Sequence, residues 1–335
     1  MSERPTPPHG PHDPHEGAPP RRPGSVRRTS TIDTNRPDGV DGDARMDGRA
    51  RDLLTGRDGT AEVVGEAALV ATVGGMTRVL AELRTDPPRP ALGALVGAMV
   101  GPGFRGRMDG LVPDERDGRT LLYLLLDDLP GAALVSGYAL LHAGAVGGRH
   151  DGYLDAAVDQ CAGWAGDAGM MTFIRAEHRS PVPRGPVAPP LEAADDPLSW
   201  HASSRVGPHG HRRRRRVDVR PAGADTYAVD AHFRDSHVDG AGRETVIHEY
   251  TVEAVVDGTE RTVRSIGAAA DVLPWAECPA AVDSAVRVVG RSLAELRPWV
   301  RKTFTGTSTC THLNDMLRSL SDVDALIDRL VASGI

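Results

Sequence analysis

The chain has 335 residues, enough for two domains that each bury a hydrophobic core. A net charge of −7 and an aromatic content of 4% make nucleic acid an unlikely partner, because binding to it needs a basic surface and stacking side chains. No apolar run reaches the roughly 20 residues of a bilayer-spanning helix, so no membrane partner is expected. Three widely spaced cysteines and the lack of an apolar signal segment after Met1 favour a cytoplasmic protein.

Lysine is nearly absent from the basic residues. Lys302 is the only lysine, whereas arginine, alanine, glycine and aspartate are abundant. This bias is typical of a bacterial genome of high GC content. We therefore interpret the excess of arginine as mutational and not as a sign of function.

The first part of the chain is poor in large apolar residues. Residues 1–55 are rich in proline, histidine, arginine, aspartate and glycine. Such a segment buries too little surface to offset the entropy of ordering, so the composition predicts a disordered tail.

A first structured unit is expected over residues 56–145. An apolar, β-branched stretch over 60–73 predicts one or two strands, and apolar residues at helical spacing predict helices near 76–83 and 91–99. Two further helices are expected over 120–129 and 132–143.

Residues 146–211 separate this unit from a second one. A polar helical pattern surrounds Tyr153, Ala157 and Cys161, and a proline-rich linker follows it. The second unit, 212–335, has strands that alternate polar and apolar residues and ends in helices. The last of these, 311–330, carries apolar residues at i, i+3, i+4 and i+7: Leu313, Met316, Leu317, Leu320, Val323, Ile327 and Leu330.

The two units resemble each other in sequence. Residues 64–75 align without a gap on 247–258, and 118–124 stand opposite 307–313. In both units strands precede helices. The sequence therefore predicts an internally duplicated α+β fold, with antiparallel strands backed by helices in each copy.

The second copy carries polar residues that the first lacks. His248, Cys310 and His312 stand where the first copy has Gly65, Leu121 and a tyrosine. Reactive side chains confined to one copy indicate where chemistry would take place.

Cys310 lies in a loop of small residues that leads into the last helix. The helix dipole there favours negative charge, which would lower the thiol pKa and make Cys310 a nucleophile or a metal ligand. Cys310 could equally be a small buried residue at a tight helix entry. His312 has the same two interpretations, as a base or ligand and as a packing residue.

Asp235 and His237 share one face near the end of a strand, and His248 lies on a neighbouring strand. Together they would form an acid–base group at the rim of the Cys310 site, and a solvent-exposed hairpin end is the alternative. In a second arrangement the ligands of a metal are Cys278, Cys310, His312 and His248. Zinc and iron are then the candidate ions, although the cofactor stays unknown.

Five consecutive arginines begin the second copy. Such a run is often a solvated strand entry, but Arg214, Arg215 and Arg216 would also suit the binding of an acidic substrate tail, such as that of coenzyme A. The chain contains no dinucleotide fingerprint, P-loop, serine-hydrolase elbow or HExxH pattern.

The second copy resembles the bacterial family of unknown function DUF2889, over about residues 212–325. The resemblance rests on the strand with His248, on the segments 273–279 and 289–290, and above all on Thr309-Cys310-Thr311-His312-Leu313-Asn314-Asp315. The family name implies no activity. Because Cys278, Cys310 and His312 fall within its motifs, the resemblance implies that they form a site.

These observations favour an enzyme that performs acid–base or thiol-assisted chemistry on a small apolar or acyl-linked substrate. Isomerisation, dehydration, cyclisation and hydrolysis all remain open. A metal-binding or metal-transfer accessory protein and a non-catalytic interaction module are the alternatives.

Overall fold

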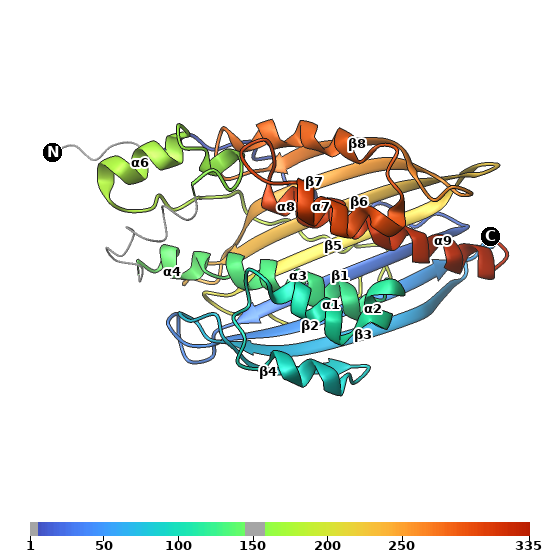
Figure 1. Cartoon of the computed structure of the whole chain (residues 1–335), viewed down its shortest axis with the longest axis horizontal. Coiled ribbons are helices and arrows are strands. Elements are labelled where there is room, and N and C mark those ends of the chain that lie inside the picture. The colour runs from blue at the N-terminus through green and yellow to red at the C-terminus, as the bar shows by residue number, and fades with distance from the viewer. Residues whose placement is uncertain (1–5, 145–157) are drawn as a thin grey trace.

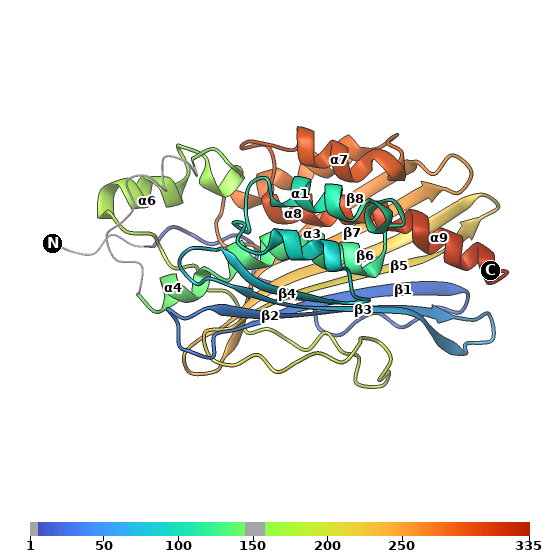
Figure 2. The same cartoon turned by 60° about the horizontal axis from the view of Figure 1, so that its bottom comes forward.

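The computed structural model describes residues 6–144 and 158–335. Its strands form one antiparallel sheet in the order β4-β3-β2-β1-β5-β6-β7-β8, with the helices packed on one face (Figures 1 and 2). The strands are β1 Ser25–Asn35, β2 Ala44–Thr55, β3 Ala61–Val73, β4 Leu80–Asp86, β5 His211–Gly223, β6 Thr226–Val238, β7 Glu244–Asp257 and β8 Val263–Val272.

The α-helices are α1 Phe104–Leu111, α2 Pro113–Asp117, α3 Leu121–Val135, α4 Tyr138–His142, α6 Gly169–Glu177, α7 Leu293–Thr303, α8 Thr311–Ser319 and α9 Val323–Ala332. Short 3-10 helices are η1 Pro90–Leu95, η2 Ala162–Trp164, η3 Cys278–Val288 and η4 Leu320–Asp322. The predicted α+β class is confirmed. We call β1 to α4 the N-terminal half and β5 to α9 the C-terminal half.

The two halves share an order of elements and several local details. Each has a four-stranded antiparallel meander, then a 3-10 helix, then α-helices, and β1 pairs with β5 at the centre of the sheet. Arg78 and Arg261 have left-handed backbone conformations, with φ of 53° and 52°, in the turns before β4 and β8. A bulge follows Asp52 in the β2–β3 pairing and follows Asp235 in the β6–β7 pairing.

The prediction of a disordered segment over residues 1–55 is wrong. β1 and β2 come from this segment, and β1 lies at the centre of the sheet with almost every residue buried. Its charged residues are satisfied across strands: Arg28 binds Asp52 through two hydrogen bonds of 2.8 Å, and Asp33 accepts from Arg212. Long-range ion pairs therefore replace the apolar content on which the prediction depended.

Other element predictions also change. The helix expected near 76–83 is a turn that leads into β4, and the one near 91–99 is the shorter η1. The helices expected over 120–129 and 132–143 are found as α3 and α4. Tyr153 and Ala157, from the predicted polar helix, lie outside the described residues, while the segment 178–210 crosses the sheet face opposite the helices (Figure 2).

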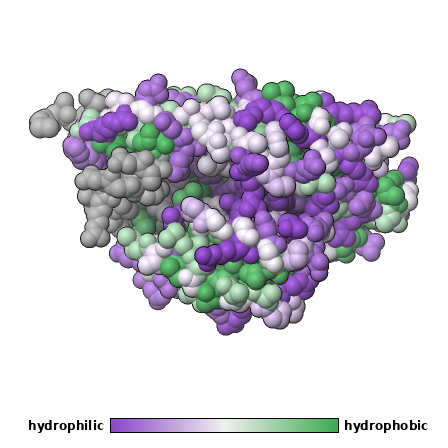
Figure 3. Space-filling model, viewed as in Figure 1, coloured by the Kyte–Doolittle hydropathy of each residue, from purple (hydrophilic) through white to green (hydrophobic). Residues whose placement is uncertain are grey.

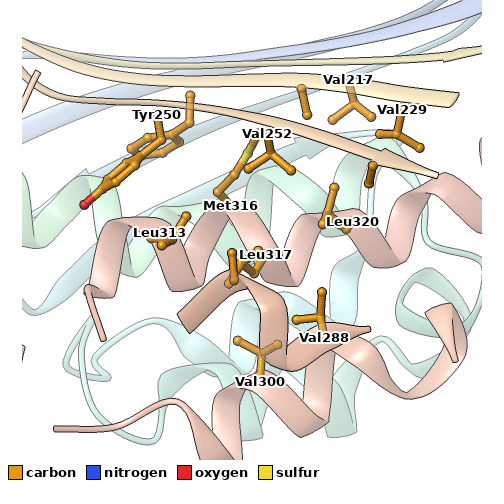
Figure 4. Close-up of a cluster of buried hydrophobic side chains, with 14 of the residues drawn as sticks. Val217, Val229, Tyr250, Val252, Val288, Val300, Leu313, Met316, Leu317 and Leu320 are labelled. Atoms are coloured by element: carbon orange, nitrogen blue, oxygen red, sulfur yellow. The ribbon is translucent and has the colours of Figure 1, made fainter. Parts of the chain in front are cut away.

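The core of the C-terminal half lies between the sheet and α7, α8 and α9. The predicted apolar face of the last helix is buried, although the helix is divided into α8, η4 and α9. Figure 4 shows side chains of α8 and of the start of η4 packed between the sheet and the neighbouring helices: Leu313, Met316, Leu317 and Leu320 against Val217, Val229, Tyr250, Val252, Val288 and Val300.

One helical stretch of the described residues, Leu121–His142, is long and apolar enough to cross a membrane by length and composition alone. Within the fold, 72% of its most apolar window is buried. It also carries Asp127 and Asp128, which form buried ion pairs with Arg297 and Arg215. These features are those of a core helix that covers the sheet, and this face of the molecule is mainly hydrophilic outside (Figure 3).

The central position of β1 leads to a first prediction. A chain that starts at residue 56 lacks β1 and β2, which breaks the pairing between the two halves. We expect it to be aggregated or unfolded in circular dichroism and size-exclusion chromatography. A chain that starts at residue 6 serves as the control and should keep the melting temperature of the full chain; equal melting of both truncations would contradict the observed topology.

A second prediction concerns acid stability. Burial lowers the pKa of His201 to about 3 and the pKa of His232 to about 4, whereas both titrate near 6.5 in the unfolded chain. Below pH 6.5 the unfolded state therefore binds more protons, and stability falls with pH down to those folded values. We expect the melting temperature to fall by several degrees between pH 7 and 5, before the carboxylates titrate.

His201→Gln provides the matched variant, because the His201 ring lies 2.7 Å from the Thr29 hydroxyl on the sheet face opposite the helices. Glutamine does not titrate, so the melting temperature of this variant should fall less between pH 7 and 5 than that of the unmodified chain. The difference is the contribution of His201. A melting temperature that is constant from pH 7 to 5 in the unmodified chain would exclude buried neutral histidines.

Candidate functional site

A cavity of about 400 Å³ lies between the two halves, and we call it the pocket. Most of its wall is apolar and comes from α3, α4, η2 and the segments around Val73 and Trp275. Polar side chains gather on one part of its wall: His248, His312, Cys161, Cys278 and Cys310.

Two elements bring the histidines together. On the sheet, Asp235 of β6 pairs directly with His248 of β7, so their side chains lie on the same face, towards the helices. Cys310 has an extended backbone at the N-cap of α8, and His312 follows in the first helical turn. The rings of His248 and His312 stack with centroids 3.5 Å apart and planes inclined by 15°.

Asp235 is the third member of this group. One ligand atom from each of Asp235, His248 and His312 lies within 4.8 Å of the other two, and all three residues are buried. His312 Nε2 is 3.7 Å from Asp235 Oδ2, and His211 Nε2 is 3.6 Å from Asp235 Oδ1. We call Asp235, His248 and His312 the triad.

Arg213 holds the Asp235 carboxylate. Its Nε donates to Oδ1 at 2.9 Å and its Nη2 to Oδ2 at 2.8 Å. Each carboxylate oxygen keeps a further lone pair, so Asp235 is fixed in orientation and can still accept another partner.

The imidazoles are uncharged at neutral pH. Burial, assisted by the positive charge of Arg213, lowers the pKa of His312 to about 3, and burial lowers the pKa of His248 well below its ordinary value. His211 is similar, with a pKa of about 4. Among the described residues, His248 Nδ1 and both ring nitrogens of His211 have no hydrogen-bond partner. The group thus keeps buried lone pairs that nothing in the described fold satisfies.

The three cysteines of the chain all line the pocket as free thiols. Cys310 Sγ is 3.8 Å from His312 Nδ1, and the Tyr250 hydroxyl, which has no hydrogen-bond partner among described nitrogens and oxygens, faces the same thiol. Burial raises the pKa of all three thiols, that of Cys161 to about 12.

The prediction of a lowered Cys310 pKa is therefore wrong. Backbone N–H groups of His312 and Leu313 at the start of α8 do stabilise the thiolate, but desolvation is the larger effect. Cys310 rests as a protonated thiol.

Other predictions of the site are partly confirmed. His248, Cys278, Cys310 and His312 line one pocket, as expected, while their chemical roles stay predictions. Asp235 is fully buried beside His248 and not at the rim. His237 does not line the pocket; its ring lies 4.4 Å from that of His142.

Arg214, Arg215 and Arg216 do not line the pocket. Arg215 reaches Asp128 beneath the helices, whereas Arg214 and Arg216 point to the opposite face and bind Glu192 and Asp230. The prediction that they hold an acidic substrate tail in this pocket is wrong, because alternation along β5 and existing ion pairs commit each of them elsewhere.

Sequence reasoning missed three residues of the site. Arg36 lines the pocket from the end of β1, which the composition had assigned to a disordered tail. Cys161 lies in a segment for which the sequence predicted only a polar helix, and His211 directly precedes the run of arginines. Of the three, only His211 could have been predicted from the sequence, because it begins a strand that pairs with the strand of Asp235.

Fold and site together define an antiparallel α+β protein with a buried histidine–cysteine pocket between its two halves. Residues 211–325 match the family model of DUF2889, described as a protein of unknown function. The match covers His211, the triad, Cys278 and Cys310, and it confirms the resemblance seen in the sequence. No curated protein and no solved structure matches the chain.

The raised thiol pKa values give a third prediction. At pH 8 the native thiols should react with a disulfide reagent more slowly than a free cysteine because burial lowers their thiolate fraction; at Cys161, whose pKa is about 12, the reduction is roughly a thousandfold. Release of thionitrobenzoate from Ellman's reagent measures the rate, and unfolding in guanidinium chloride should restore it. A fast native phase that disappears in Cys310→Ser would instead identify Cys310 as a thiolate.

Proposed function

We propose that the protein is an enzyme that binds a small apolar or acyl-linked substrate in the pocket and carries out acid–base chemistry beside the triad. The carrying observation is a largely apolar cavity whose wall holds the stacked rings of His248 and His312, with His248 Nδ1 buried and without a hydrogen-bond partner among the described residues. Each unsatisfied buried polar group costs about 1–3 kcal/mol, which folding alone gives no reason to retain.

The dimensions and lining of the pocket support a small organic ligand. Its volume of about 400 Å³ lies within the range of typical ligand sites. Apolar side chains make up most of the wall, among them Val73, Leu134, Leu140, Met170 and Trp275. An aliphatic or aromatic body of modest length would fit this surface.

Arg36 supports an acidic or carbonyl-bearing group on that substrate. It is almost fully buried, its Nη atoms donate to the carbonyls of Gly42 and Ser136, and its Nε has no partner among the described residues. The charges of Asp41 and Asp43 act on Arg36, but no carboxylate of the described residues forms an ion pair with it. A substrate carboxylate or thioester oxygen would complete its hydrogen bonds.

The protonation states favour acid–base chemistry over nucleophilic attack by Cys310. Burial raises the pKa of the Cys310 thiol, so little thiolate is present to attack a substrate. Isomerisation and dehydration of an acyl substrate include a proton transfer at the carbon next to the carbonyl, whereas cyclisation and hydrolysis move protons on the attacking and leaving groups. A metal-transfer role is less well supported, because the triad is buried and transfer needs exchange with a partner.

We further propose that the two halves arose by duplication and that the N-terminal half shapes the pocket. Support comes from the shared element order and from Asp52 and Asp235, which precede equivalent bulges and are each held by an arginine. Opposite Asp52 stands Gly65, and there Arg329 fills the space that a histidine side chain would need. Free thiols in a pocket also support a bacterial cytoplasmic protein.

Deuterium exchange tests the activity without knowledge of the final product. The full chain is incubated in D2O with octanoyl, 2-octenoyl and 3-hydroxyoctanoyl thioesters of N-acetylcysteamine, and mass spectrometry measures deuterium at carbons next to the carbonyl. We expect incorporation with at least one of them, lost in His312→Gln but retained in Cys310→Ser. If mass spectrometry finds no deuterium in any thioester and no consumption of any of them, the proposal is wrong.

A fourth prediction concerns Arg36. Arg36→Met should weaken octanoate binding by about 10- to 100-fold, the value of a charge-assisted hydrogen bond, while 1-octanol binding should stay unchanged. Isothermal titration calorimetry measures both affinities. Arg45→Met, at a half-exposed arginine paired with Asp47, is the control and should leave both affinities unchanged.

A further inference from the structure

We propose that the triad binds one divalent transition-metal ion, with open coordination positions facing the pocket. This inference deepens the proposed function, since it assigns the group that performs proton transfer at the same site. The ligand set differs from the one expected from sequence: Asp235 enters it, and Cys278 and Cys310 leave it.

Geometry is the first argument. The three ligand atoms lie within 4.8 Å of one another, and they come from β6, β7 and the first turn of α8. Metal bonds of about 2.1 Å in a tetrahedral site place ligand atoms about 3.4 Å apart, so small side-chain rotations suffice. Helix and sheet fix the backbone of all three residues, which keeps the group assembled.

Unsatisfied polar atoms are the second argument. His248 is 4% exposed and its Nδ1 has no partner among the described residues. Two neutral imidazoles stacked at 3.5 Å gain little from each other, because neither offers the other a hydrogen bond in this geometry. An ion between these nitrogens and the carboxylate would satisfy all three groups.

The residues around the triad are the third argument, because they resemble the outer shell of metal sites. Arg213 orients Asp235 through both oxygens, as outer-shell partners of ligating carboxylates do. His211 Nε2 lies 3.6 Å from Asp235 Oδ1, where it could donate a hydrogen bond to this carboxylate or act as a further ligand. The pocket supplies space for water or substrate at the remaining positions.

The donor set selects the class of ion. Two imidazole nitrogens and one carboxylate suit Zn²⁺ or Fe²⁺, whereas Mg²⁺ and Ca²⁺ prefer oxygen and Cu⁺ prefers sulfur. A bound ion would also supply a base at neutral pH, because water on zinc has a pKa near 7.

The N-terminal half offers a matched control. Asp52 is fully buried and held by Arg28 through two hydrogen bonds, as Asp235 is held by Arg213, but its neighbours are Gly65 and Arg329 and no histidine. Asp52→Asn and Asp235→Asn therefore remove comparable buried ion pairs, and only the second removes a ligand.

Titration of the metal-stripped full chain with Co²⁺ tests the inference. We expect one Co²⁺ per chain, with visible d–d absorption and without the near-ultraviolet sulfur-to-cobalt band that thiolate ligands give. Asp235→Asn and His312→Gln should weaken binding at least about 100-fold, while Asp52→Asn and Cys310→Ser should retain it. Thermal melting of each variant shows whether it is folded; His312→Gln, which changes no ion pair of Arg213, keeps the test decisive if Asp235→Asn unfolds.

Three outcomes would overturn the inference: no stoichiometric Co²⁺ in the unmodified chain, equal binding in Asp235→Asn and Asp52→Asn, or a sulfur band that disappears in Cys310→Ser. Its failure is distinguishable from failure of the proposed function. If metal-stripped protein still catalyses deuterium exchange, the metal inference is wrong and the proposed enzymatic function stands. If the protein binds Co²⁺ but catalyses no exchange, the metal inference stands and the proposed reaction is wrong.

Discussion

The structure depends on the ion pairs that Arg213 makes beneath the helices. Its guanidinium holds Asp235 through two hydrogen bonds, and its Nη1 donates to Asp315 of α8 at 2.8 Å. From the N-terminal half, α3 approaches so closely at Gly131 that a Cβ there would lie 2.1 Å from Arg213 Nη1. One side chain thus joins both halves and orients the carboxylate of the site. Removing one partner of such a buried group typically costs about 3–5 kcal/mol, so stability and site geometry depend on the same contact.

The N-terminal half also has a buried aspartate held by an arginine, and there the pair has only a structural role. Arg28 holds Asp52 and also approaches Asp322 at 3.3 Å, and Arg329 reaches Asp52 at 2.9 Å. Two arginines thus close the position at which the C-terminal half has stacked histidines. The charge of Asp52 is balanced there by these arginines, and Arg329 occupies the space beside Gly65. In the C-terminal half, neutral imidazoles leave the corresponding space open towards the pocket.

Features with local periodicity could be predicted from sequence, and features set by distant partners could not. The apolar face of α8 and the strand of His248 followed from spacing, and the matching register of 64–75 and 247–258 placed His248 and Cys310 in one pocket. The strand β1 was missed because its stability comes from partners such as Asp52 and Arg212, which are remote in sequence. The Cys310 pKa was misjudged because a helix N-terminus is visible in a sequence and burial is not.

Electrostatic balance in the pocket connects the proposed ion to the proposed substrate. Arg213 binds both Asp235 and Asp315, and the histidines and thiols beside them are uncharged. A divalent ion would add two positive charges there, and Arg36 lies on the wall of the same pocket. In an apolar cavity such an excess is costly unless an anion accompanies it. Hydroxide on a bound metal ion, or an acidic or enolate group on the substrate, would supply such an anion. The proposed ion and the proposed acyl substrate therefore account together for the charges of this pocket.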